Sequence, residues 1–385
     1  MTQTGFPPDH TAKWLRLHLT NQVGPRTFAR LLDRLGGIDE VLGASAGRLA
    51  TVPHIGPKKA ELIAAGRDDA DVETELALAE KLGVQIITIQ NDAYPPLLRQ
   101  ISDPPHVLYV KGALRRQDEL AVAIVGSRNC TIYGSEQASR LSHLLTAAGF
   151  TIVSGLARGI DTAAHRGALA AEGRTIAVQG CGLALVFPPE NAKLAQQIIA
   201  AGALVSELPL TFEPLAATFP TRNRIISGLS LGTIIVEAHA RSGALITAAQ
   251  ALEQNREVMA VPGKVDAPGS FGPHSLIRDG AKLITGIEDI LDCLGRVGEI
   301  LTDHAAVAAD RAEQQAQPTL FDIDRIKLTD PERAILDCFD GDTVHIDELI
   351  ARSNLPAGTA NAAATSLQLK GIIRQLPGSY YQKSR

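Results

Sequence analysis

The feature that most constrains the fold is a strand–turn–helix pattern that occurs twice in succession in the middle of the chain. Residues 121–125 are wholly apolar, as expected of a strand buried on both faces, and residues 151–153 are the next strand. A glycine turn and a segment with helical spacing of apolar residues follow each strand, and Asp161 or Thr162 is expected to cap the second helix. This order predicts a βαβ unit with a right-handed crossover, which brings both turns to the carboxyl edge of a parallel sheet.

The alternation of apolar runs and helical segments continues on both sides of this unit. It predicts an α/β fold with a Rossmann-like doubly wound sheet, flanked by smaller modules. The further expected strands are residues 84–89, 107–110, 175–178, 203–206, 233–236 and 257–261.

Composition limits the class of protein. A chain of 385 residues is too long for one ordinary core, so two or three domains are expected. No apolar run approaches the roughly 20 residues that span a bilayer, and the first residues lack a signal-peptide pattern. The four cysteines form no CxxC pair, so we expect reduced thiols in a cytoplasmic protein and no zinc site. We also expect no cofactor. The net charge of −5 counts mildly against nucleic-acid binding, although a local basic patch remains compatible with it.

Residues 1–83 are expected to form a small helical domain. The segments VGPR and IGPK each precede an amphipathic helix, which is the helix-hairpin-helix pattern. Turn amides and a helix N-terminus can hold a DNA phosphate, and Lys58 and Lys59 are placed to assist. His54 replaces the usual first glycine of such a hairpin and removes a position of close approach. The sequence leaves open whether this module contacts DNA or serves packing and protein contact.

The sheet domain is expected to cover residues 84–296, and the polar, Ala- and Gln-rich residues 297–327 are expected to form a linker. Residues 328–385 have the order helix, helix, helix, two-stranded ribbon, which is typical of a winged helix. The third helix carries one charge, Lys370, which favours a protein-contact or regulatory role over the reading of DNA.

Four turns at the strand ends carry residues that suit phosphate groups. Hydroxyls, open amides at helix N-termini and guanidinium groups are the phosphate ligands expected at such an edge. A structural role is the alternative for each turn: a surface arginine, a helix cap or an exposed basic helix start. The candidate residues are Ser127 and Arg128 in the first turn, Ser154 and Gly155 in the second, Arg222, Asn223 and Arg224 in the third, and Ser242 and Gly243 in the fourth.

Enzyme signatures are missing from these turns. The first strand is not followed by GxGxxG, and the chain contains neither a Walker A motif nor a GxSxG elbow. Several phosphate-binding turns without an evident nucleophile indicate a protein that binds a polyanion backbone. Aromatic residues make up 4% of the chain, so backbone contacts should dominate and sequence preference should be low.

The motifs in these turns closely resemble those of the DNA-processing protein family DprA, also called Smf. The matching blocks include VAIVGSR, IVSGLARGIDTAAHRGAL, FPTRNRIISGLS and VEAHARSGALITAAQALEQNREVMAVPG, and they occur in family order from about Tyr94 to Leu283. The resemblance implies an extended Rossmann fold that binds single-stranded DNA and forms a homodimer through that fold. It also implies that the protein loads the RecA recombinase onto incoming strands during natural transformation and is not an enzyme. The match adds Lys264, after the PG turn, to the DNA-binding residues.

Two other functions remain as alternatives. Rossmann relatives of the lysine-decarboxylase-like type hydrolyse nucleotide phosphoribosyl bonds, and Glu237 near Ser242 and Gly243 is the candidate for their catalytic turn. That turn is normally PGGxGT, whereas the chain has ARSGALIT. A purely protein-binding scaffold is the third hypothesis. Phe187 and His274 depart from the DprA pattern, which puts the polar contacts of those two positions in doubt.

Overall fold

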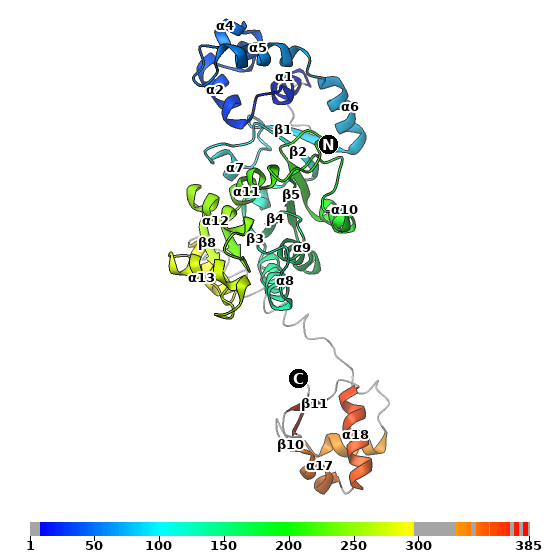
Figure 1. Cartoon of the computed structure of the whole chain (residues 1–385). Coiled ribbons are helices and arrows are strands. Elements are labelled where there is room, and N and C mark those ends of the chain that lie inside the picture. Colours follow the sequence, from blue (N-terminus) through cyan, green and yellow to red (C-terminus); the bar gives the residue numbers. More distant parts are fainter. Residues whose placement is uncertain are drawn as a thin grey trace. The chain divides into compact units, whose positions relative to one another are not determined.

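The structure is a computed structural model that describes residues 8–295, 329–339, 344–353, 355–369, 373–376 and 380–383. The chain divides into two compact units, Met1–Ala312 and Glu313–Arg385, which are described separately (Figure 1). The expected linker, residues 297–327, lies outside the described residues. Within the described ranges, no helix has both the length and the apolar character required to cross a bilayer.

A nine-stranded sheet forms the centre of the first unit, with the order β1-β2-β6-β5-β4-β3-β7-β8-β9. The pairs from β6 to β9 are parallel, whereas β1 and β2 run antiparallel at one edge. The predicted doubly wound α/β fold is therefore confirmed. The strands are β1 (Val84–Thr88), β2 (Val107–Gly112), β3 (Ala121–Val125), β4 (Thr151–Ser154), β5 (Thr175–Val178), β6 (Ala203–Ser206), β7 (Gly232–Ile235), β8 (Glu257–Ala260) and β9 (Lys282–Leu283).

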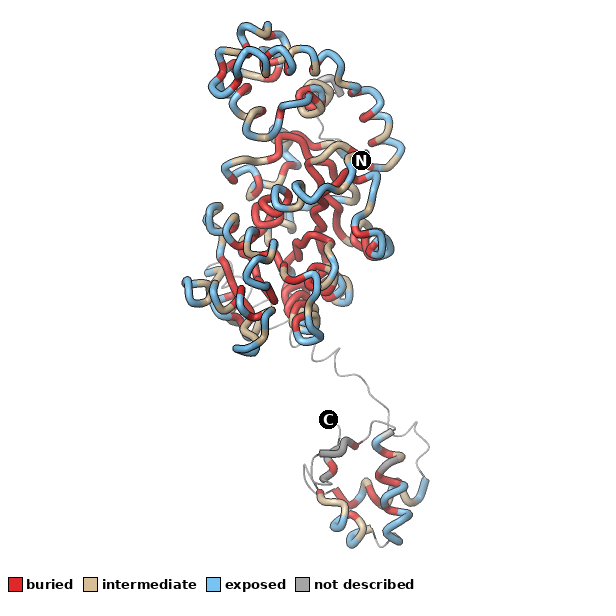
Figure 2. Tube along the Cα trace, viewed as in Figure 1, coloured by how far each residue is buried: buried red, intermediate tan, exposed pale blue. Residues whose placement is uncertain are grey.

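Helices cover both faces of this sheet because its central strands are apolar on both sides. In β3, Val122 and Ile124 face one core, whereas Ala121, Ala123 and Val125 face the other. Figure 2 shows buried residues concentrated along these strands.

The first of these cores is covered by α8 (Ile132–Ala147), α9 (Ile160–Ala170) and α14 (Ile287–Leu294). The second is covered by α7 (Pro96–Arg99), α11 (Thr218–Gly228) and α12 (Gly243–Glu253). The remaining elements of this part are α10 (Ala192–Ala201), α13 (Phe271–Arg278) and the short 3₁₀ turns η1 (Arg116–Glu119), η2 (Pro189–Asn191) and η3 (Pro268–Ser270).

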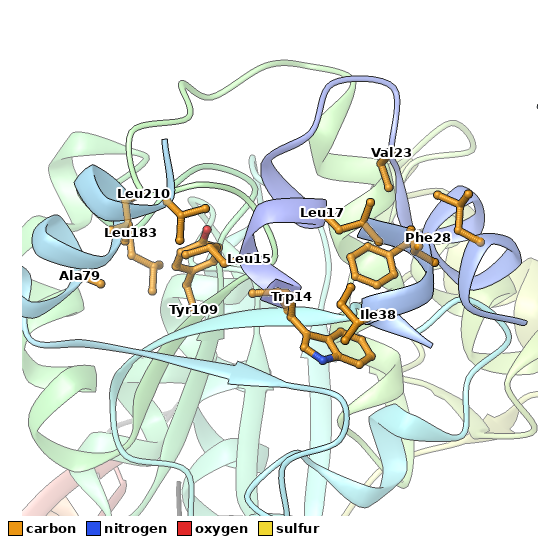
Figure 3. Close-up of a cluster of buried hydrophobic side chains, with 14 of the residues drawn as sticks. Trp14, Leu15, Leu17, Val23, Phe28, Ile38, Ala79, Tyr109, Leu183 and Leu210 are labelled. Atoms are coloured by element: carbon orange, nitrogen blue, oxygen red, sulfur yellow. The ribbon is translucent and has the colours of Figure 1, made fainter. Parts of the chain in front are cut away.

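The N-terminal helices pack directly on the edge of the sheet and share a core with it. Trp14 stacks on Phe28, and Tyr109 from β2, Leu183 and Leu210 belong to the same buried cluster (Figure 3). Burial of such large side chains is the main favourable term in docking the two parts. The helices are α1 (Pro8–Leu19), α2 (Pro25–Leu35), α3 (Ile38–Gly43), α4 (Ala46–Leu49), α5 (Pro57–Asp68) and α6 (Val72–Leu82).

The second unit has the predicted winged-helix arrangement. Its helices α16 (Asp330–Asp337), α17 (Ile346–Ser353) and α18 (Ala357–Leu369) enclose a small core of their own. The ribbon consists of β11 (Ile373–Leu376) and β12 (Tyr380–Lys383), and β10 (Val344–His345) adds a third strand beside β12.

Candidate nucleic-acid interface

A cleft of about 570 Å³ opens at the carboxyl ends of β3 and β7, between the Ser127 turn, α11 and the start of α12. It brings together six of the residues predicted from the sequence: Ser127, Arg128, Arg222, Asn223, Ser242 and Gly243. Side chains that the sequence reasoning did not single out also line it: Asn129, Phe219, His239 and Arg241.

The Ser127 turn holds its shape through the backbone and presents Arg128 to solvent. The Ser127 amide donates to the carbonyl oxygen of Glu237 at 2.6 Å, and the Asn129 amide donates to Ser127 Oγ at 3.2 Å. The exposed Arg128 guanidinium lies over the Phe219 ring, with 5.2 Å between Cζ and the ring centroid. Phe219 also contacts Phe187 at a centroid distance of 5.6 Å. An arginine and an aromatic face therefore stand side by side at the mouth of the cleft.

The N-terminus of α8 does not serve as the anion site that the sequence suggested beside Ser127. The Glu237 carboxylate occupies this helix end. Its Oε2 accepts from the Thr131 amide at 2.8 Å, and its Oε1 accepts from Thr131 Oγ1 at 2.5 Å. A side chain at Gly134 would collide with the same carboxylate. Because a carboxylate satisfies the helix dipole there, an external phosphate would be repelled at α8.

Arg222 forms the floor of the cleft. It lies within α11 with 5% of its surface exposed, and its Nη1 donates to the carbonyl oxygen of Gly155 at 2.7 Å and to that of Val178. Burial lowers the Arg222 pKa to about 10, so the group remains charged at neutral pH. Position 155 requires glycine, because a Cβ there would overlap the Arg222 guanidinium. The fold therefore fixes a buried cation below the cleft.

Asp161 organises the turn after β4 rather than capping α9. The N-cap is Gly159 at φ +72°, so the expectation that Asp161 or Thr162 caps this helix is wrong. Asp161 Oδ2 accepts from the amides of Gly155 at 3.1 Å and Ala157 at 3.3 Å. Burial raises the Asp161 pKa, and the positive charge of Arg222 opposes that rise.

Glycine is required at the cap position because a Cβ at Gly159 would overlap the carbonyl oxygen of Ser127. The same close approach lets the Ile160 amide donate to that oxygen at 3.2 Å. The turns after β3 and β4 are thereby joined to each other.

Four predicted residues do not reach the surface of the cleft. Ser154 is fully buried and its Oγ donates to the Ile124 carbonyl oxygen at 2.6 Å, while Gly155 is buried against Arg222. Arg224 Nη2 is paired with the buried Glu207 carboxylate. Lys264 is exposed after β8 but is not among the residues that line the cleft.

The start of α12 closes the other side of the cleft. Ser242 Oγ caps the helix by accepting from the Ala244 amide at 3.3 Å, and Gly243 is exposed with open space around its Cα. Asn223 Nδ2 donates to the Gly243 carbonyl oxygen at 3.2 Å and ties α11 to α12. The positive end of an 11-residue helix thus faces the cleft.

Arg241 is the cation that the sequence reasoning missed. It is exposed on the loop after β7, next to Ser242. Its presence in ARSG, between a predicted strand and a predicted helix, was a usable signal. Among the residues that line the cleft, three arginines face one acidic side chain, Asp161. The cleft is therefore positive in a chain whose net charge is −5.

Comparison with known families matches this fold. The family model described as DNA recombination-mediator protein A matches residues 85–295. The chain belongs to the DprA/Smf family. Models of a DprA-like N-terminal HHH domain and a DprA winged-helix domain match residues 8–76 and 311–379. Protein Smf of Synechocystis is 35% identical, with 97% of this chain and 98% of that protein covered.

Solved structures of DprA proteins agree with the architecture. The DprA structure from Streptococcus pneumoniae aligns with a TM-score of 0.65 at 35% identity, over 73% of this chain and 97% of that chain. A Helicobacter pylori DprA, whose structure is described for its single-stranded DNA binding mode, aligns with a TM-score of 0.50 at 32% identity. That alignment covers 55% of this chain and 95% of the Helicobacter pylori chain.

Proposed function

We propose that the protein binds single-stranded DNA through the sugar-phosphate backbone in the cleft between the Ser127 turn and α12. The observation that carries the proposal is the convergence of Arg128, Arg222 and Arg241 on one cleft beside the N-terminus of α12. Guanidinium groups and helix N-termini are both ligands for phosphate. These groups read charge rather than base identity, so binding with little sequence preference follows.

The preference for a single strand rests on Phe219. Its ring is half-buried in the lining of the cleft and contacts the Arg128 guanidinium and, at a tilt of 38°, the Phe187 ring. An unpaired base can stack on such a ring, whereas the bases of a duplex are already stacked on one another. The single-stranded DNA binding mode described for the Helicobacter pylori relative supports the same assignment.

We further propose the role of a recombination mediator that loads RecA onto the bound strand during DNA uptake. Membership of the DprA/Smf family supports this step, because the matched family model is described as DNA recombination-mediator protein A. A homodimer formed through the sheet domain belongs to the same proposal. Sedimentation of the full chain tests the dimer, and RecA filament assembly on a strand bound by the protein tests the loading.

Fluorescence anisotropy with labelled oligonucleotides tests the binding itself. We expect tight, salt-sensitive binding of single strands over duplex. Arg128→Ala should weaken binding of all sequences and reduce the slope of log K against log salt by about 0.7, the value for one lost single-strand phosphate contact. Arg166→Ala is the matched control, because Arg166 is also an exposed arginine but lies on α9 outside the cleft lining. No binding at low salt, or equal loss in both variants, would contradict the proposal.

A further inference from the structure

Two helices of the N-terminal domain begin in the same way and at neighbouring places. Helices α2 and α5 both have glycine as N-cap, Gly24 and Gly56, followed by proline, and neither has an acidic residue in its first turn. Lys59 Nζ donates to Thr27 Oγ1 at 3.1 Å, so a side chain from the first turn of α5 reaches the first turn of α2. The two helices, of 12 and 11 residues, each add a positive end to this part of the domain. Arg26 and Lys58 add two exposed cations there.

A groove of about 460 Å³ runs between the first turn of α2 and helix α11. Pro220 lines this groove and also lines the cleft described above, so the two depressions adjoin at that residue. The other residues that line the groove are Gly24, Pro25, Arg26, Thr27, Asp103, Thr221, Arg224 and Gln250. A strand that leaves the cleft past Pro220 would enter the groove.

Arg224 is the second, independent sign of a ligand in this groove. Only 3% of its surface is exposed, and its Nη2 is paired with Glu207. Its Nη1 lacks a hydrogen-bond partner among the described residues, although this side chain lines the groove. Buried guanidinium N–H groups are costly to leave unpaired, and a phosphate oxygen would satisfy this one.

One acidic side chain, Asp103, stands among the described residues that line the groove. Two cations flank it: Arg26 Nε lies 3.9 Å and Arg224 Nε 3.7 Å from Asp103 Oδ2. Asp103 is therefore shared by two guanidinium groups, of which Arg224 is also paired with Glu207. Lys59, bonded to Thr27, adds a third positive charge behind them.

We propose that the start of α2 and Arg224, which line the same groove, form a second phosphate-backbone subsite for the same DNA strand, to which the start of α5 is linked through Lys59. This inference rests on the proposed function, since the strand reaches the groove from the cleft. The N-terminal domain then extends the binding path instead of serving only as a packing module.

The test uses charge reversal at the two exposed cations, in the double variant Arg26→Glu, Lys58→Glu of the full chain. Carboxylates near a helix N-terminus are favourable to the helix and offset the loss of the exposed ion pair between Arg26 and Asp103, so the unfolding temperature should change little. Affinity for long oligothymidylate should nevertheless fall by roughly tenfold or more, and the salt slope by about 1.4, which corresponds to two lost phosphate contacts. The control, Arg34→Glu, reverses the charge of one arginine on the last turn of α2.

Oligothymidylates of increasing length separate this subsite from the cleft. We expect the wild-type affinity to rise in two stages as the strand fills the cleft and then reaches α2, and the double variant to lose only the second stage. A double variant that binds every length like wild type, or like Arg34→Glu, would overturn the subsite and leave the cleft assignment intact. Failure of the wild type to bind any length would overturn the proposed function as well.

Discussion

The guanidinium of Arg128 lies over the ring of Phe219, 5.2 Å from its centroid. This contact joins the turn after β3 to helix α11 across the mouth of the cleft. It places a phosphate ligand directly against an aromatic ring on which a base can stack. The binding free energy at this point should therefore have two contributions. The contact of Arg128 with a phosphate should weaken as salt is added, whereas the stacking of a base on Phe219 should not depend on salt.

Substitution of Phe219 should remove the part that does not respond to salt. We expect Phe219→Ala to weaken single-strand binding by roughly 1 to 3 kcal/mol, the range for loss of one stacked base, with the salt slope unchanged. Anisotropy titrations at several salt concentrations measure both quantities. Phe219→Tyr keeps the aromatic face and should bind like wild type. Equal losses in the two variants would mean that the ring supports the loop and does not stack on a base.

The position of the Arg222 guanidinium depends on the missing side chain of Gly155. Gly155→Ala places a methyl group on the guanidinium and should destabilise the protein by roughly 1 to 3 kcal/mol, as overpacking of a full core does. Urea unfolding followed by circular dichroism measures this change. Gly243→Ala is the matched control, because a Cβ there meets open space and should stabilise by up to about 1 kcal/mol. Equal stability of the two variants would contradict the packing argument.

Much of the sheet could be predicted because its strands are short apolar runs that end at glycines or turns. The predicted bounds 121–125, 175–178 and 203–206 agree with β3, β5 and β6. Strands that are buried on both faces are continuous apolar runs, so their bounds do not depend on an alternation of polar and apolar residues. In a parallel sheet the turns after these strands all lie at its carboxyl edge. The prediction that Ser127, Ser242 and the start of α11 converge follows from that topology, and the cleft confirms the convergence.

The directions of side chains on α11 could not be predicted in the same way. Residues 222–224 read as one local cation site in the sequence, but α11 runs through them and turns Arg224 about 200° away from Arg222. Arg222 lines the cleft and Arg224 the neighbouring groove. Likewise, the pairing of Glu237 with Thr131 joins residues far apart in the chain, so no local pattern could indicate that the N-terminus of α8 is already occupied.

Buried neutral histidines should make the stability of the chain fall in acid. Burial lowers the pKa of His18 and of His106 to about 4, and that of His165 to about 3, from 6.5. Below pH 6.5 these histidines become protonated in the unfolded chain but stay neutral in the native state, because their native pKa values are lower. Stability is therefore full above that pH and falls, by at most about 1.4 kcal/mol per pH unit for each histidine, as pH drops toward the native pKa values.

Urea titrations at about pH 7 and about pH 5 measure this loss, because the two values lie on either side of the unperturbed histidine pKa. His106→Phe keeps a ring for the stack on Phe28, where the centroids are 4.3 Å apart, and removes one titrating group. It should reduce the fall in stability between the two pH values. An unchanged fall would mean that His106 already takes up its proton in the native state.

Glu237 separates the DNA-binding function from the hydrolase alternative, since that alternative uses its carboxylate as a catalytic group. The carboxylate instead accepts two hydrogen bonds from Thr131 at the start of α8. We expect Glu237→Gln to lose roughly 1 kcal/mol of stability through the weakened helix cap, without a loss of affinity for single-stranded DNA.

Wild-type protein should release no nucleobase from nucleoside monophosphates above a blank without protein, as measured by chromatography of the reaction. Release by the wild type that disappears in Glu237→Gln, with the affinity for DNA retained, would instead assign this cleft to phosphoribosyl hydrolysis. The wild type thus gives opposite results under the two functions. Glu237→Gln then shows whether any release depends on this carboxylate, which otherwise accepts hydrogen bonds from Thr131.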